Sequence, residues 1–229
     1  MAVARSSPSK DPARARRPSR VRMTGAERRE QLIDVSRELF AGRGYEGTSV
    51  EEIAAKAQVS KPVVYEHFGG KEGLYAVVVD REVNTLLDGI LSSLTAESLA
   101  DAHPEHRQRE LIERAALALL DYIENNTDGF RILSRDSSVG QSTGSFASLL
   151  SDVASQVEGI LVAEFRSRGL EAKTAPMYAQ MLVGMVALTG QWWLDTRRPK
   201  KSEVAAHVVN LAWNGLSKLE AKPKLLTRR

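Results

Sequence analysis

The feature that most constrains this chain is the spacing of its apolar residues from residue 24 onward. They recur every three or four positions, and no stretch alternates apolar with polar residues as a half-buried strand would. A helix with this spacing buries one apolar stripe and exposes the rest of its surface. The sequence therefore predicts an all-α fold, with helices over about 24–41, 50–57, 61–68, 71–94, 105–125, 128–135, 145–168, 175–196 and 202–219.

Composition narrows the class of protein. The 229 residues are 42% apolar, enough for one large domain or two modest ones, and they include no cysteine. Disulfides, thiolate metal sites and cysteine nucleophiles are therefore excluded. The longest apolar stretch, 181–194, is interrupted by Gln191 and followed by charged residues, so we expect no membrane span. Because the N-terminus lacks the apolar stretch of a secretory signal, we expect a cytoplasmic protein.

Charge is divided between the ends of the chain and its middle. Residues 1–22 carry a net charge of +6 and residues 222–229 a net charge of +4, whereas the residues between them carry −7. The first segment is rich in Arg, Ser, Pro and Ala, a composition typical of disorder. It is either a solubilising or transit-type extension or an arm that reaches the phosphate backbone of DNA. We expect a disordered basic arm over 1–22 and a basic tail over 222–229.

Three short helices near the N-terminus predict a DNA-binding head. Thr24 and Glu27 have the spacing of a capping box, and Pro62 falls in the first turn of the third helix, where its missing N–H has no cost. A turn from Gln58 to Ser60 separates the second helix from the third, which is the helix-turn-helix arrangement. The residues expected to form the shared core are Leu32, Leu39, Phe40, Val50, Ile53, Val59, Val64 and Phe68.

The same region resembles a known family. The stretches Gly44-Tyr45, Thr48 to Ala54, Val59 to Lys61, Tyr65 to Phe68 and Lys71 to Leu74 are similar to the head of the TetR family of transcriptional regulators. The sequence departs from the family pattern at two places, since Gln58 replaces the usual turn glycine and Pro62-Val63 replace a commoner pair where bases are read. The resemblance implies a regulator and not an enzyme, most commonly a repressor, that binds a palindromic operator in double-stranded DNA as a homodimer. We expect a helix-turn-helix domain over 23–75 and a ligand-binding and dimerisation domain over 76–221.

The expected contacts with DNA lie at the starts of the second and fourth helices and on the outer face of the third. Hydroxyl and N–H groups at a helix start attract phosphate, the resemblance places a tyrosine and a histidine at the DNA backbone, and a lysine is expected to reach guanine. The alternative is ordinary capping and surface charge. Because residues 23–75 carry seven basic and nine acidic side chains, either the basic groups gather on one face of the head or the arm supplies the missing attraction to DNA. The expected DNA-binding residues are Thr48, Ser49, Ser60, Lys61, Pro62, Val63, Tyr65, His67 and Lys71.

The last two helices predict a subunit interface. The helix over 175–196 is apolar on most sides and carries small residues that allow another helix to approach, and the final helix is its natural companion. Two such pairs would form a four-helix bundle across a two-fold axis, as in proteins of the resembling family. The expected interface residues are Ala187, Val204, Val208 and Leu211.

Large and flexible apolar side chains in the later helices either fill the core or line a cavity. In the resembling family this region holds a small-molecule pocket, and because the lining expected here is apolar with few charges, we expect an elongated hydrophobic ligand. Lys61-Pro62-Val63, Trp192-Trp193 and the stretch 210–213 are similar to members that sense fatty acids or acyl-CoA, so we expect a long-chain acyl-CoA or fatty acid and control of lipid and fatty-acid metabolism genes. The alternative is a regulator of an efflux or catabolic operon with another hydrophobic ligand. The expected lining is Leu120, Ile123, Phe130, Leu150, Val157, Met181, Met185 and Trp192.

The sequence gives weaker support to two other classes of protein. Gly140 to Gly144 matches the GxSxG nucleophile elbow and makes a serine hydrolase through Ser142 the remote alternative, but that elbow needs a strand leading into a helix. A sequence-blind architectural DNA binder would explain the basic ends but not the long second half. His103 and His106 could suggest a metal site, but they have no further partner nearby in the sequence. We expect no catalytic residue, no cofactor and no metal.

Overall fold

A computed structural model of the chain describes residues 23–93, 107–135 and 146–225, and every regular element within these ranges is helical, which confirms the predicted fold class. The elements are α1 (Gly25–Arg43), α2 (Val50–Lys56), α3 (Lys61–Phe68), α4 (Lys71–Ser93), α5 (Arg107–Asn125), α6 (Thr127–Arg135), α7 (Phe146–Ser167), the short 3₁₀ helix η2 (Ala172–Thr174), α8 (Ala175–Thr196) and α9 (Lys201–Ser217). The predicted arm, the GxSxG stretch and the last four residues lie outside the described ranges.

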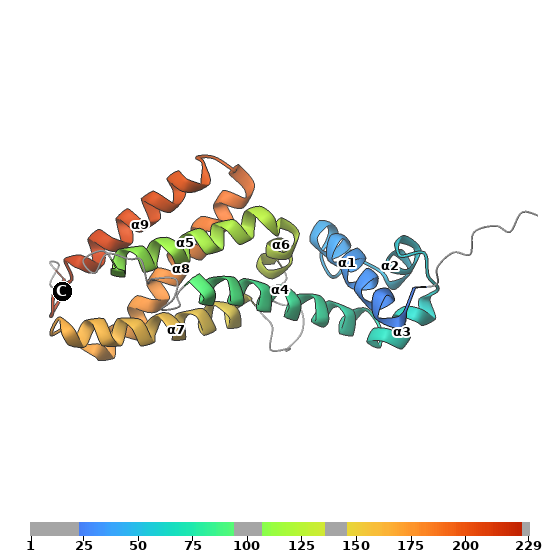
Figure 1. The fold of residues 1–229 in the computed structure, drawn as a ribbon, viewed down its shortest axis with the longest axis horizontal. Helices are drawn as coiled ribbons and strands as arrows, with labels where there is room; N and C mark the ends of the chain where they lie inside the picture. Colours follow the sequence, from blue (N-terminus) through green and yellow to red (C-terminus); the bar gives the residue numbers. More distant parts are fainter. Residues whose placement is uncertain (1–22, 94–106, 136–145, 226–229) are drawn as a thin grey trace, which may run out of the picture.

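The first three helices form a head at one end of the molecule (Figure 1). Capping boxes begin both α1 and α2: the Glu27 N–H donates to the Thr24 hydroxyl, and the Glu52 N–H donates to the Ser49 hydroxyl. The core of the head is made of fully buried side chains from α1, α2, α3 and the first turn of α4. These are Leu32, Phe40, Ile53, Ala57, Val64 and Leu74.

The other helices form a longer body, and α4 runs from the head into it (Figure 1). In the body α7 packs along α8, and α5 packs between α4 and α9. One continuous core joins the head to the body, because buried side chains of α4 such as Val78 and Leu86 belong to the same cluster as Phe40 and Leu120. A second, smaller core around Phe165 joins α7 to α8.

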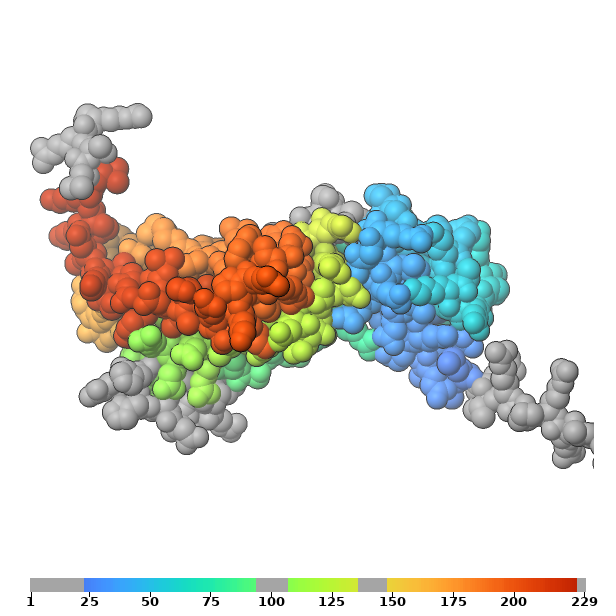
Figure 2. Space-filling model, turned by 90° about the horizontal axis from the view of Figure 1, so that it is seen from above, coloured from blue at the N-terminus to red at the C-terminus, as the bar shows by residue number. Residues whose placement is uncertain are grey.

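The helix α6 fills the space between the head and the body (Figure 2). Asp128 and Gly129 both lie inside α6, although glycine often ends a helix, and the chain leaves α5 at Asn126. Gly129 is in the helix because of what lies against it: a Cβ there would be 1.8 Å from Glu82 Oε2. The glycine therefore marks a close approach and not a turn.

The turn between α8 and α9 is fixed to the end of α5. The Arg197 guanidinium donates to the Thr127 hydroxyl at 2.7 Å and to the Ile123 carbonyl at 3.3 Å. The Trp193 indole N–H donates to the Pro199 carbonyl at 2.9 Å, and Lys201 forms an ion pair with Asp121 at 2.6 Å. These bonds hold the start of α9 against α5, while the far end of α9 is bonded to Arg168, the residue that follows α7.

Candidate nucleic-acid interface and apolar cavity

The turn between α2 and α3 presents the outer face of α3 to solvent. Gln58 adopts a left-handed conformation with φ of 56°, the conformation that the missing glycine would have taken most easily. The Val59 N–H then donates to the Ala54 carbonyl at 2.9 Å, which closes the turn. As a result Ser60, Lys61 and Pro62 are exposed at the start of α3. This is the geometry that a recognition helix needs.

The predicted residues at the start of α2 have structural partners. Thr48 is buried, and its hydroxyl donates to the Gly44 carbonyl at 2.9 Å, so the expectation that this hydroxyl binds phosphate is wrong. The Ser49 hydroxyl accepts the Glu52 N–H at 3.2 Å, and the Ser49 N–H donates to the Glu52 carboxylate at 3.0 Å. Ser49 is therefore the N-cap of α2, as the capping alternative predicted, whereas Thr48 bonds within the turn that precedes the helix.

The other predicted contacts lie on or beside the outer face of α3. The Tyr65 side chain is 54% exposed, whereas Val63 and His67 are half-buried. Val63 packs against the core, so less of it is available to a base than the sequence suggested. Lys61 forms an ion pair with Glu51, and this bond lowers the pKa of the Glu51 carboxyl below its usual value. A carboxylate thus stands beside the expected base-reading lysine.

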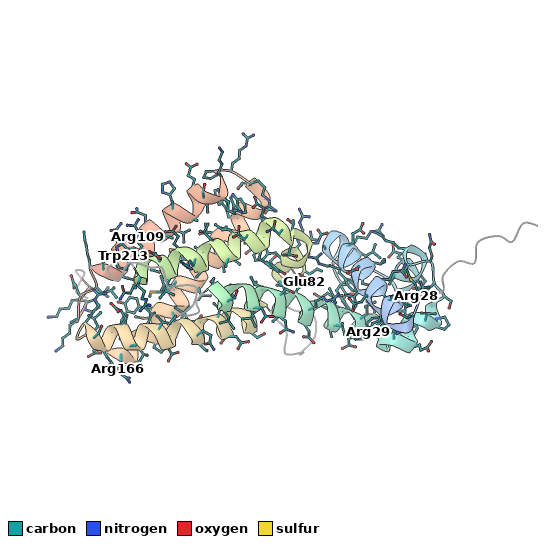
Figure 3. All side chains as sticks on the ribbon, viewed as in Figure 1. Arg28, Arg29, Glu82, Arg109, Arg166 and Trp213 are labelled. Atoms are coloured by element: carbon teal, nitrogen blue, oxygen red, sulfur yellow. The ribbon has the colours of Figure 1, made fainter. Side chains whose placement is uncertain are left out.

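Lys71 is held in place at the start of α4. Its ammonium donates to the Tyr45 carbonyl at 3.0 Å and lies 4.0 Å from the centre of the Tyr45 ring. One cation that the sequence did not single out performs a similar task. Arg29 in α1 donates to the His67 carbonyl at 3.1 Å and lies 4.4 Å from the centre of the Phe68 ring (Figure 3). It fixes the end of α3 to α1, and nothing in the sequence pattern marks it for this role.

The body encloses an elongated cavity of about 680 Å³ between α4, α5, α7, α8 and α9. Its lining on α5 extends from Arg107 to Leu119, which is about 18 Å along the helix axis. On α7 the lining extends from Leu149 to Ser167, about 27 Å by the same measure. Most of the lining side chains are aliphatic. A pocket of this size and composition suits a small, largely apolar molecule.

The predicted lining residues divide into three groups. Leu150, Val157 and Met185 line the cavity. By contrast, Leu120, Ile123 and Phe130 are fully buried in the core, so we correct their assignment. Met181 and Trp192 lie on the exposed side of α8 and are corrected too. The sequence did not predict that α4 contributes to the lining, although its Leu86 and Ile90 also line the cavity. The apolar stripe of a helix does not show whether the stripe faces a filled core or a cavity.

The exposed side of α8 carries a stripe of large apolar side chains that no other described residue covers. Met177, Met181, Leu188 and Trp192 are each about half to two-thirds exposed, and Leu211 of α9 is exposed as well. We name these five residues the α8 stripe.

Three of the four predicted interface residues lie elsewhere. Ala187, Val204 and Val208 are buried inside the chain, and only Leu211 is on the surface. Gly190 is one of the small residues of this helix, and the helix that it admits is α5 of the same chain, since a Cβ there would be 2.7 Å from Ile123 Cδ1. The helix is apolar on most sides, and the sequence did not tell which side meets its own chain.

Comparison with known proteins decides the family. The family described as "Bacterial regulatory proteins, tetR family" matches residues 32–78, and the one described as "Tetracyclin repressor-like, C-terminal domain" matches residues 108–215. The HTH-type transcriptional activator FasR of Mycolicibacterium smegmatis is 34% identical over 201 residues, which cover 86% of each chain. The chain belongs to the TetR family. It is therefore a DNA-binding transcriptional regulator and not an enzyme.

Solved structures show the TetR fold. A TetR-like transcriptional regulator from Rhodococcus sp. RHA1 superposes with a TM-score of 0.64 at 23% identity, over 86% of this chain and all of that one. The transcriptional regulator FadR from Bacillus subtilis, solved in complex with stearoyl-CoA, superposes with a TM-score of 0.62 at 17% identity, over 80% of this chain and 96% of that one. TetR regulators bind DNA as dimers and respond to small molecules.

The described ranges contain neither a membrane-spanning helix nor a metal-binding cluster. None of the helices there is long and apolar enough to cross a membrane. Within the same ranges no three acidic or histidine side chains stand close enough together to hold a metal ion. The pair His103 and His106 lies outside these ranges.

Proposed function

We propose that this TetR regulator binds a long-chain fatty acid or acyl-CoA in the cavity of its body, and that the ligand changes its affinity for an operator of lipid-metabolism genes. The observation that carries the proposal is the form of the cavity, which is elongated and lined mainly by aliphatic side chains. An acyl chain matches such a lining without needing polar partners along its length. The complex of B. subtilis FadR with stearoyl-CoA supports this class of ligand.

The helix α4 supplies a physical link between the ligand and DNA. Leu86 and Ile90 line the cavity, whereas Glu82, one turn earlier on the same helix, meets the head at Arg37. A ligand that favours one position of α4 therefore favours one orientation of the head. Ligand and operator then change each other's affinity by the same factor. The sign of this coupling depends on which orientation of the head fits the operator, and the relative FasR is named an activator.

We further propose that the dimer forms through the α8 stripe. Exposed apolar side chains at positions 177, 181, 188 and 192 follow one face of a helix and are costly to leave in water. A second copy related by a two-fold axis would cover the same stripe with itself. Such a dimer presents two α3 helices, which is what reading a palindrome requires.

The experiment measures operator binding with and without ligand. An operator is first selected from random DNA with the full chain, and its affinity is then measured by fluorescence anisotropy with stearoyl-CoA, stearate or CoA alone. We expect the two acyl compounds, and not CoA, to change the affinity at least 10-fold, which corresponds to about 1.4 kcal/mol of coupling.

A variant that fills the cavity tests its role. Val157→Trp places a large ring among the lining residues, whereas Gln156→Trp places the same ring at an exposed position of α7 that does not line the cavity, as a matched control. We expect V157W to bind the operator and ignore the acyl compounds, and Q156W to respond as the wild type does. If no acyl compound changes the operator affinity of the wild type, the proposed ligand is wrong, but the protein is still a DNA-binding regulator.

A further inference from the structure

The charged and apolar parts of the cavity lining lie at opposite ends. The helix α5 begins, and α7 and α9 end, at the end of the body that faces away from the head (Figure 1). The charged lining residues Arg107, Glu164 and Arg168 belong to these helix ends. Toward the head the lining consists of buried aliphatic side chains, among them Leu86 and Leu119. We call the first end the rim and the second the inner end.

Arg168 is held at the rim by the end of α9. Its Nη1 donates to the Leu216 carbonyl at 2.9 Å, and its Nη2 donates to the Ser217 carbonyl at 3.0 Å. A guanidinium has five N–H groups, so three remain for a ligand. The bonds to α9 also fix the direction in which these groups point, which lowers the entropy lost when an anion binds.

Arg107 faces the same opening from α5. Within residues 23–93, 107–135 and 146–225, no side chain or carbonyl forms a hydrogen bond or ion pair with its guanidinium. The one carboxylate in the lining, Glu164, accepts a hydrogen bond from Gln108 at 3.4 Å. The rim thus holds two guanidinium groups against one carboxylate. Guanidinium groups bind carboxylates and phosphates with paired hydrogen bonds, so the rim favours an anion.

We propose that the cavity binds an amphiphile in one direction only, with its anionic headgroup at Arg107 and Arg168 and its apolar tail toward Leu86 and Leu119. This inference rests on the proposed function and adds the orientation of the ligand to it. The headgroup is a carboxylate in a free fatty acid and a phosphate in an acyl-CoA, and the two share the chemistry that the rim offers.

The orientation implies that the length of the tail decides the response. A tail anchored at the rim must extend about 18 Å along α5 before it reaches Leu119 at the inner end. There it also meets Leu86 of α4, the helix that carries Glu82 to the head. A long tail therefore contacts α4 at its inner lining residues, whereas a short tail stays near the rim. Short acyl compounds should bind without changing operator affinity.

The test compares anionic with neutral ligands in matched variants. The substitutions Arg107→Gln, Arg168→Gln and the double variant remove the rim charges. Arg109→Gln and Arg166→Gln are the controls, because both arginines are exposed on the same helices at the same end and neither lines the cavity (Figure 3). Affinities for stearate, stearoyl-CoA, octanoate and stearyl alcohol are measured by titration, with fluorescence of the rim residue Trp213 as a second readout.

We expect the double variant to lose roughly 10-fold or more in affinity for stearate and stearoyl-CoA and to keep its affinity for stearyl alcohol. R107Q is decisive even if R168Q disturbs the end of α9, since Arg107 has no described partner to lose. A loss confined to stearoyl-CoA assigns the rim to the phosphates, and a loss that includes stearate assigns it to a carboxylate as well. Octanoate should bind the wild type and leave operator affinity unchanged.

Three results would overturn the orientation. One is equal loss in R109Q and R166Q, which would make the effect one of general surface charge. Another is unchanged affinity of the double variant for both anions. The third is a response to octanoate as large as that to stearate. Each of these results leaves the proposed function intact. The proposed function itself would be wrong if the wild type bound none of stearate, stearoyl-CoA and stearyl alcohol.

Discussion

Nε of Arg37 in α1 lies 2.7 Å from Oε1 of Glu82 in α4, and the Glu82 side chain is only 5% exposed. The second carboxylate oxygen accepts the Tyr122 hydroxyl of α5 at 2.6 Å. Burial, and then the Glu82 charge, raise the pKa of Tyr122 far above its usual value, so its hydroxyl keeps the proton that it donates. One carboxylate therefore connects the head with two helices of the body, and a buried charge that loses its partner is costly.

Replacing this carboxylate should weaken the joint between head and body. Glu82→Gln keeps the shape but leaves the Arg37 guanidinium without its counter-charge, and we expect a loss of about 1–3 kcal/mol in the free energy of unfolding, measured by urea denaturation. Glu30→Gln is the control, because the Glu30–Arg81 pair joins the same two helices at the surface. That change should cost less than about 1 kcal/mol. Equal losses would mean that burial of the Glu82 pair adds nothing.

Gly129→Ala should destabilise the protein although alanine favours helices. Its Cβ would lie 1.8 Å from Glu82 Oε2 and 2.7 Å from the Tyr122 hydroxyl, so the carboxylate must move away from its partners. We expect a loss of about 1–3 kcal/mol in thermal or urea unfolding. The same substitution at Gly159, where nothing lies within 4 Å of the added Cβ, should instead stabilise the protein by up to about 1 kcal/mol. Stabilisation at both sites would show that the contact relaxes freely.

Lys61→Gln should weaken operator binding by about 1–3 kcal/mol and reduce its dependence on the sequence of one base pair. Lys56→Gln is the matched control, since Lys56 is paired with Glu38 at the end of α2. Glu51→Gln should strengthen operator binding, because it removes the carboxylate that pairs with Lys61 in the free protein. Fluorescence anisotropy over a salt series measures all three. A Lys61 variant that binds every operator variant as the wild type does contradicts the assignment.

Leu188→Glu should separate the dimer. The side chain is 66% exposed within one chain, so a charge there does not disturb the fold but cannot be buried against a second copy. Sedimentation is expected to show monomers, and the affinity for the operator should fall because the dimer is lost. Gln156→Glu, a change at an exposed position of α7 outside the α8 stripe, should leave the dimer intact. A dimeric L188E would move the interface away from the α8 stripe.

The cap of α2 should make the head sensitive to acid. The Ser49 N–H and then the Ser49 hydroxyl lower the pKa of Glu52 by hydrogen bonding to its carboxylate. A carboxyl with a lowered pKa stabilises the folded state above its unfolded pKa of about 4.3, and this contribution is lost as the pH falls through the folded value. The difference in melting temperature between wild type and Glu52→Ala should therefore be full at pH 7 and shrink below about pH 4. A difference independent of pH would exclude this origin.

Local patterns predicted the helices well, because caps and apolar spacing act within a few residues of each other. The capping box of Thr24 and the short third helix followed from these rules, and Gln58 adopts the left-handed conformation that its place in the turn required. The family also followed from residues that lie together in the head. The sequence alone was thus sufficient for the fold class and for the exposed start of α3.

Properties that depend on which helix lies opposite could not be predicted in the same way. The apolar character of α8 was clear, but Ala187 faces the core while Leu188, one residue later, faces solvent. The need for glycine at position 129 could not be predicted, because the side chain that it admits, Glu82, is 47 positions earlier in the chain. The cavity was assigned partly to core residues such as Ile123, since periodicity shows that a side is apolar but not whether the space beyond it is filled.

The continuity of α4 has a consequence for how the protein unfolds. The boundary we expected at residue 75 falls in the second turn of this helix, and Val78, Val79 and Glu82 beyond it pack as part of the same core as α1. We therefore expect head and body to unfold in one cooperative transition, without separate melting points. A fragment cut at residue 75 would remove the part of α4 that packs on α1, so we expect an independently folding head to need α4 at least as far as Glu82, the partner of Arg37.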